Sequence, residues 1–226
     1  MKKTKKGFTL AEILVALGVI GVVAALTIPT VANSINKAKI GPTLAKVIAQ
    51  IETGNKNIIN FANSQSEIAN SGAFFDRLSP IRTSDLGLPG ANTPILNNFR
   101  DIVPPHWSVD RINTLNGITV RRFNGNIDNT TAGEINGQPY YKFKNLPAEI
   151  VTVNVVGSAQ LLNINSPTTI GIYVDINGWN TRPNTVGKDI FAFQLQNNGL
   201  LTPLTGTEAG VYAQRIINDG FKVTYY

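Results

Sequence analysis

The stretch from Gly7 to Pro29 reads GFTLAEILVALGVIGVVAALTIP and decides the N-terminal part of the fold. A lysine-rich segment, residues 1–6, precedes it, and the 21 residues of 8–28 carry a single charge, on Glu12. A helix of that length spans about 30 Å of hydrocarbon. The stretch therefore predicts a membrane-spanning helix. The position of Glu12 requires an explanation, because a carboxylate inside a membrane is energetically costly.

Gly7-Phe8-Thr9-Leu10 followed by Glu12 resembles the class III signal of type IV pilins and type II secretion pseudopilins, and Pro29 lies where that family commonly has a proline. The resemblance implies that a prepilin peptidase cuts between Gly7 and Phe8 and methylates the new amino group of Phe8. It also implies that Glu12 serves filament assembly by pairing with that amine, since a buried charge is tolerated when it has a partner. The implied partners are the peptidase, the inner membrane and other pilin subunits, contacted through the N-terminal helix.

The same resemblance sets the expected domain limits. Residues 1–7 are a leader, 8–28 a transmembrane and filament-core helix, 29–63 its amphipathic continuation, and 64–226 an exported globular domain. The lysines of the leader favour a cytoplasmic N-terminus before assembly. The C-terminal domain is then periplasmic, or extracellular in a filament.

An ordinary secretory signal peptide and a plain single-span anchor are the alternatives for this N-terminus. A conventional signal has a shorter apolar stretch followed by small residues at a cleavage site. Here Glu12 interrupts the apolar run, and no Ala-x-Ala site follows before Pro29. These features favour the pilin-type signal.

The formal net charge of +6 arises from 20 Lys and Arg against 14 Asp and Glu, and it is unevenly distributed. Four lysines lie in residues 1–6, and without them 16 basic side chains face 14 acidic ones. The remaining chain has no basic run longer than Arg121-Arg122. We therefore expect no nucleic-acid partner.

Motifs of known enzyme classes are missing from the sequence. The chain has no cysteine and one histidine, His106, and it lacks a Gly-x-Ser-x-Gly elbow, a P-loop and a His-Glu-x-x-His pair. A lone histidine after a double proline is more often structural than a ligand. We expect no catalytic residues, and an anchored periplasmic enzyme ranks last among the candidate functions.

Helical periodicity continues beyond Pro29. Apolar residues recur at spacings of three and four, with polar residues between them, which predicts one long helix over 8–63 with an amphipathic second half. Pro29 should kink this helix, and Gly41-Pro42 should bend it again. The apolar positions are Ile40, Leu44, Val47, Ile48, Ile51, Ile58, Ile59 and Ala62.

From Gly117 onward the apolar period changes to two, which is typical of strands with one buried face. The alternation and the intervening Asn/Gly turns predict strands at 117–123, 139–143, 151–155, 170–176, 191–195 and 221–226. A short helix is predicted at 208–218, closed by Gly220. The segment before the strands offers only two possible short helices, 73–78 and 94–103. The predicted fold is α+β, a long N-terminal helix packed on an antiparallel sheet, which is the pilin architecture.

The loop from Asp175 to Asp189 is rich in oxygen-bearing side chains and resembles an Asp/Asn-rich loop of pilin-like proteins, some of which bind calcium there. Calcium favours six to eight oxygen ligands. An EF-hand is excluded, because Gly178 comes one place too early and the final Glu is missing. The alternative is a turn in which Asx side chains bond to their own backbone. The candidate ligands are Asp175, Asn177, Asn180, Asn184 and Asp189.

The favoured function is a structural subunit, a major or minor pilin or a pseudopilin, of a type IV pilus or type II secretion-like filament. The alternative is an adhesin or ligand-binding module that the pilin-type anchor displays at the cell envelope. Trp107 and Trp179 would then be exposed aromatic residues suited to glycan contact.

Overall fold

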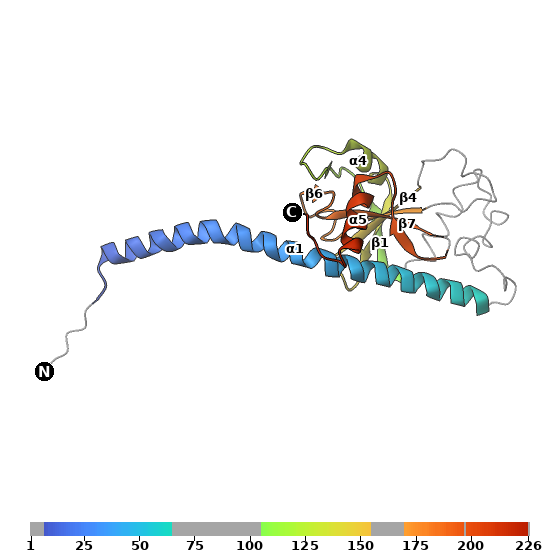
Figure 1. Ribbon diagram of the computed structural model, residues 1–226, viewed down its shortest axis with the longest axis horizontal. Coiled ribbons are helices and arrows are strands. Elements are labelled where there is room, and N and C mark those ends of the chain that lie inside the picture. Colours follow the sequence, from blue (N-terminus) through green and yellow to red (C-terminus); the bar gives the residue numbers. More distant parts are fainter. Residues whose placement is uncertain (1–6, 65–104, 155–169, 197, 226) are drawn as a thin grey trace. The chain divides into compact units, whose positions relative to one another are not determined.

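A computed structural model describes residues 7–64, 105–154, 170–196 and 198–225 (Figure 1). The chain divides into two compact units, Met1–Lys39 and Ile40–Tyr226. The predicted helices at 73–78 and 94–103 lie outside the described residues. Both units share one element, the long helix α1.

Helix α1 spans Leu10–Ser64, close to the predicted 8–63. Within the described chain it is the one helix long and apolar enough to cross a membrane, and the most apolar window of this helix has none of its residues buried. This confirms the predicted long helix with an apolar stretch sufficient to span a membrane. The helix continues without a break through Pro29 and Gly41-Pro42, so neither site ends it, and the expected bends remain predictions.

Three hydroxyl side chains in the first unit form hydrogen bonds within the helix. The hydroxyls of Thr27, Thr30 and Ser34 each donate to the carbonyl oxygen four residues earlier, at 2.9, 3.1 and 3.0 Å. In hydrocarbon no water is present to bond a free hydroxyl, so these internal bonds would make the three side chains tolerable in or beside a membrane.

The described part of the second unit contains a six-stranded antiparallel sheet in the order β1-β3-β4-β5-β7-β8. The predicted α+β fold is therefore confirmed, although β1 and β8 at the two edges were not predicted. The bounds are β1 (Val109–Thr114), β3 (Pro139–Phe143), β4 (Glu149–Asn154), β5 (Ile170–Asp175), β7 (Ile190–Leu195) and β8 (Leu201–Pro203).

The expectation of one buried face per strand is wrong for the centre of the sheet. All six residues of β5 are buried. Ile172 and Phe193 lie on one face with α1, whereas Tyr173 and Ala192 lie on the other. A strand covered on both sides has no solvated face, so hydrophobic alternation identifies only the more apolar of its two surfaces.

The face of the sheet that carries Tyr173 and Ala192 is covered by short elements and the loops between them. Helix α4 (Asn129–Ile135) begins at an Asp128 cap. Strand β2 (Val120–Arg121) pairs in parallel with β6 (Asn184–Thr185), so the predicted strand at 117–123 is reduced to two residues outside the main sheet.

Helix α5 (Glu208–Asn218) matches the predicted helix, and Gly220 takes the left-handed conformation with φ +64°. The N–H of Phe221 bonds the carbonyl of Ile216, and the N–H of Gly220 bonds that of Ile217, which together form a Schellman cap. The predicted final strand is wrong: residues 221–225 form no strand.

The second half of α1 belongs to the core of the second unit. Asn55 is fully buried; it donates to the carbonyl of Gly199 at 2.7 Å and accepts from the Trp107 indole at 2.8 Å. Glu52 accepts from the N–H of Leu201 at 3.0 Å. These bonds tie the helix to the β7–β8 hairpin. The predicted apolar positions that are buried are Ile40, Leu44, Val47, Ile51 and Ile58.

Candidate functional site

The predicted processing site lies in an open segment just before α1. Gly7 has no other part of the described chain within 4 Å of the position a Cβ would take, and the Phe8 side chain is 85 % exposed. Uncovered backbone is what a peptidase needs around a scissile bond. The local geometry thus leaves the Gly7–Phe8 bond accessible, while cleavage there remains a prediction.

Glu12 is held by the start of its own helix. Its Oε2 accepts from the backbone N–H of Thr9 at 2.8 Å and from the Thr9 hydroxyl at 2.9 Å. The Thr9 hydroxyl oxygen in turn accepts from the N–H of Glu12 at 3.2 Å. This is a capping box, in which two helix-start donors are satisfied reciprocally.

Thr9 is a site residue that the sequence reasoning missed. The signal was present, because Thr9-Leu10-Ala11-Glu12 has the Ser/Thr-x-x-Glu spacing of a capping box. Glu12 therefore has a local structural reason to occupy this position, in addition to the assembly role that the resemblance implies.

The loop between β5 and β7 forms the Asx turn that the sequence offered as the alternative to metal binding. Asp175 Oδ1 accepts from the N–H groups of Asn177 and Gly178, both at 3.0 Å. At the other end, Asp189 Oδ2 accepts from the N–H of Thr185 at 3.1 Å. Both aspartates thus fold the loop onto its own backbone.

Glu149 and Asn184 hold the centre of the loop. Glu149 lies opposite Asp175 on the neighbouring strand, and its carboxylate accepts from the N–H of Trp179 at 3.0 Å. The Asn184 amide donates to the carbonyl of Trp179 at 3.0 Å. The sequence reasoning missed Glu149, because its proximity depends on the register of β4 against β5, which no local pattern indicates.

Asp175 is fully buried and Asp189 is partly buried, so the charge of each carboxylate is poorly solvated. Burial raises the pKa of Asp175 to about 8, with backbone donation from Asn177 opposing it and the charges of Asp189 and Glu149 adding to it. Burial also raises the pKa of Asp189 to about 6, opposed by the N–H of Thr185 and the charge of Lys188. Each carboxyl group here is therefore stabilised either by binding a proton, which removes its charge, or by a nearby cation.

Two buried oxygens in this region have no hydrogen-bond donor within the described chain: Asp175 Oδ2 and Asn184 Oδ1. Asn177 and Asn180, in contrast, are exposed. No group of three or more His, Cys, Asp or Glu side chains among the described residues is placed to hold a metal ion. Any cation here would therefore rely on amide or carbonyl oxygens besides the two carboxylates.

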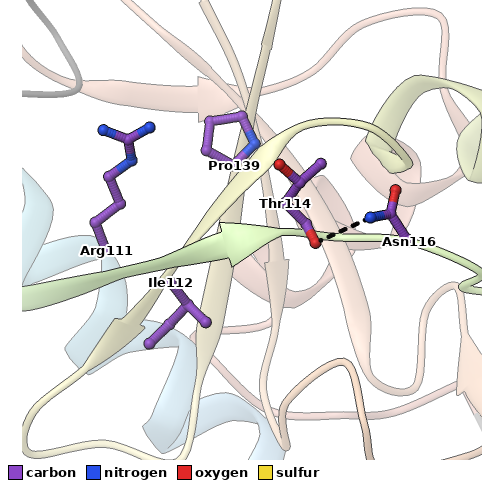
Figure 2. Close-up of a pocket in the computed structure, with 5 residues that line it drawn as sticks. All are labelled: Arg111, Ile112, Thr114, Asn116 and Pro139. Carbon is purple, nitrogen blue, oxygen red and sulfur yellow. Dashed lines mark hydrogen bonds between the residues drawn. The ribbon is translucent and has the colours of Figure 1, made fainter.

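A cavity of about 370 Å³ lies at the β1 edge of the sheet, away from both predicted sites. Figure 2 shows Arg111 and Ile112 extending to opposite sides of β1, near the point where a bulge shifts the β1–β3 register. Thr114, Asn116 and Pro139 complete the lining. None of these five residues is a His, Cys, Asp or Glu, so the lining supplies no general acid–base pair.

The two tryptophans are not exposed, which corrects the premise of the adhesin alternative. Trp107 and Trp179 are both 0 % exposed. Trp107 packs in the core under α1, and Trp179 lies in the cluster on the opposite face of the sheet. Neither indole is available for glycan contact.

A family model described as the prokaryotic N-terminal methylation motif matches residues 2–28. The match includes Gly7, Phe8, Thr9 and Glu12, so the chain carries the signal of type IV pilins and pseudopilins, as the resemblance implied. No curated protein and no solved structure matches the chain.

Proposed function

We propose that this chain is a non-enzymatic structural subunit of a type IV pilus or type II secretion-like filament. The observation that carries the proposal is the N-terminal methylation motif at residues 2–28, placed on a helix that is long and apolar enough to span a membrane. The C-terminal α+β unit would be displayed on the far side of the inner membrane.

In this mechanism the lysine-rich leader keeps the N-terminus in the cytoplasm. The prepilin peptidase removes residues 1–7, and the mature chain waits in the inner membrane until it joins a bundle of N-terminal helices. Apolar surface then leaves lipid for protein with little net hydrophobic gain, so packing and polar pairing must set the register.

The Glu12 carboxylate would have one bonding partner before cleavage and gain a second one after it. In the precursor the carboxylate is satisfied by Thr9, which lowers the cost of carrying it into the membrane. After cleavage the amine of Phe8 lies one residue before Thr9 and can join the same carboxylate. A charged pair of this kind is what makes Glu12 tolerable in a filament core.

The proposal is tested by replacing Gly7 with leucine. A bulky side chain before the scissile bond should block the peptidase, so the full-length precursor should accumulate in the inner membrane. Immunoblotting of membrane fractions, with and without the peptidase, measures this, and Gly18→Leu within the span is the control. Normal processing of the Gly7 variant would contradict the assignment of the cleavage site.

A second proposal concerns calcium at the Asp175–Asp189 loop, where the donorless oxygens of Asp175 and Asn184 favour a cation. Asp175, Asn184 and Asp189 would hold the ion, and Asn177 could add an oxygen. The ion would neutralise the buried carboxylate of Asp175 and the partly buried carboxylate of Asp189, and it would stabilise the loop.

A further inference from the structure

The C-terminal residues 220–225, which we name the C-terminal strap, contact α1 at a glycine. A Cβ on Gly41 would lie 1.7 Å from the Phe221 carbonyl oxygen and 2.7 Å from its carbonyl carbon. Only a glycine permits so close a backbone approach. This close contact explains why a glycine stands at position 41, where the sequence alone predicted only a bend in the helix.

The other end of the strap contacts the loop before β7. The Tyr225 hydroxyl donates to the carbonyl of Gly187 at 2.7 Å. The Tyr225 ring lies 4.9 Å from that of Tyr212 and 5.8 Å from that of Phe123, measured between centroids. Lys188 completes the cluster, with its Nζ 5.3 Å from the Phe123 centroid.

Gly187 is itself held tightly in this cluster. Its φ is +78°, and a Cβ there would lie 2.6 Å from the Tyr212 ring. Its two preceding residues are held by other parts of the chain. The N–H of Val186 donates to the carbonyl of Arg121, and the N–H of Thr185 donates to the Asp189 carboxylate. Loop residues 185–187 are thus held by Asp189 on one side and by the strap on the other.

Besides its two ends the strap is held by side chains: the Thr224 hydroxyl donates to Asp219 Oδ2 at 2.5 Å, and the Arg215 guanidinium lies 5.0 Å from the Tyr225 ring centroid. The strap pairs with no strand in the described chain, and Lys222 and Thr224 are exposed. Phe221, Val223 and Tyr225 are only partly buried against the core. A segment with few buried contacts opens more easily than the sheet beneath it. Releasing one end should therefore weaken the hold on the other.

We propose that the C-terminal strap is a conformational link, through which the loop at 185–187 and helix α1 at Gly41 stabilise each other. The link goes beyond the filament function and does not depend on whether calcium binds. Gly41 is the second residue of the compact unit that begins at Ile40, so the strap acts where the helix enters that unit.

The test uses hydrogen exchange on the full-length chain in detergent, following the amides of Thr185, Val186 and Gly187. Gly41→Ala should displace the strap from the helix and raise exchange at these three amides at least threefold. Gly54→Ala is the matched control, since its Cβ would also clash, 2.5 Å from Trp107 Cδ1, but outside the strap. Equal exchange in the two variants would overturn the proposal.

A second pair of variants keeps the test decisive if Gly41→Ala does not fold. Tyr225→Phe removes only the hydroxyl that bonds Gly187, and exchange at the Phe221 amide should rise at least twofold. Tyr140→Phe is its control, because that hydroxyl bonds Asn180 in the same loop but not the strap. Unchanged exchange at Phe221 in Tyr225→Phe would overturn the link.

Discussion

Thr9 and Glu12 show how a charged residue is accommodated at the start of an apolar helix. The carboxylate satisfies the N–H and hydroxyl of Thr9, and the Thr9 hydroxyl satisfies the N–H of Glu12. A helix start leaves several N–H groups without partners, and in a membrane each unsatisfied group costs several kcal/mol. The pair therefore stabilises the start of this helix.

Replacing Glu12 separates this local role from assembly. Glu12→Ala should leave membrane insertion intact, because an intramembrane carboxylate itself costs about 2.5 kcal/mol or more. If the amine of Phe8 pairs with Glu12 as proposed, incorporation into filaments should fall sharply, since that amine would lose its charged partner. Immunoblotting of sheared filaments and of membranes measures the two effects separately.

Glu12→Gln is the matched control for that experiment, because it keeps hydrogen-bonding oxygen for Thr9 and removes only the charge. If the pairing with Phe8 matters, the Gln variant should fail in filaments as the Ala variant does. Recovery of either variant in sheared filaments at the normal level would count against the assembly role of Glu12.

At this scale the sequence indicated part of the site. Gly7, Phe8 and Glu12 follow from a contiguous motif, and Thr9 could have been added from its spacing to Glu12. Glu149 could not, because it approaches the Asp175 loop only through the pairing of β4 and β5, whose nearest ends, Asn154 and Ile170, are 16 positions apart in the sequence. A short-range sequence pattern does not predict contacts that depend on the register between two strands.

Among the elements, β5, β7 and α5 were predictable for distinct physical reasons. Ile170, Ile172 and Val174 alternate in β5 and face α1. Helix α5 has a Thr207 cap at its start and Gly220 beyond its end. The edge strands β1 and β8 were missed, because charged or short sequences at a sheet edge carry no clear apolar alternation.

The final segment shows why alternation does not guarantee a strand. Phe221, Val223 and Tyr225 are partly buried, and Lys222 and Thr224 are exposed, as the sequence pattern suggests. The left-handed Gly220 and Phe221 turn the chain after α5, and the described residues offer the segment no strand to pair with. It therefore packs as the C-terminal strap.

The Asp175–Asp189 loop is the element on which metal removal can be tested. If calcium binds, the melting temperature of the full-length chain should rise with calcium concentration, because an ion that binds only the folded state stabilises it by mass action. Asp175→Ala and Asp189→Ala should each abolish that dependence. Tryptophan fluorescence during thermal unfolding is a suitable measure, since the backbone of Trp179 lies in this loop.

Asp110→Ala is the control for the loop variants, because Asp110 is an exposed acid on β1 that pairs with Lys144. It should leave the calcium dependence unchanged. If the loop is only an Asx turn, Asp175→Ala should lower the free energy of unfolding by about 1 kcal/mol with or without calcium. Identical melting temperatures in calcium and in chelator would contradict the metal proposal.

At the scale of the whole molecule, the described sheet has a hydrophobic cluster on each face. One contains the second half of α1 and Trp107, and the other contains Ile135 of α4, Trp179 and Val186. The first was predictable from the helical period of α1. The second combines the other face of β4, β5 and β7 with residues of short elements and loops, and the apolar residues of these loops are too widely spaced to give a period.

The proposed filament function rests on the N-terminal motif, so the mature N-terminus is its most direct test. Tandem mass spectrometry of the protein recovered from membranes or filaments should find a chain that begins at Phe8 and carries one methyl group on its α-amine. A chain that still begins at Met1, or that begins beyond residue 25, would contradict the account.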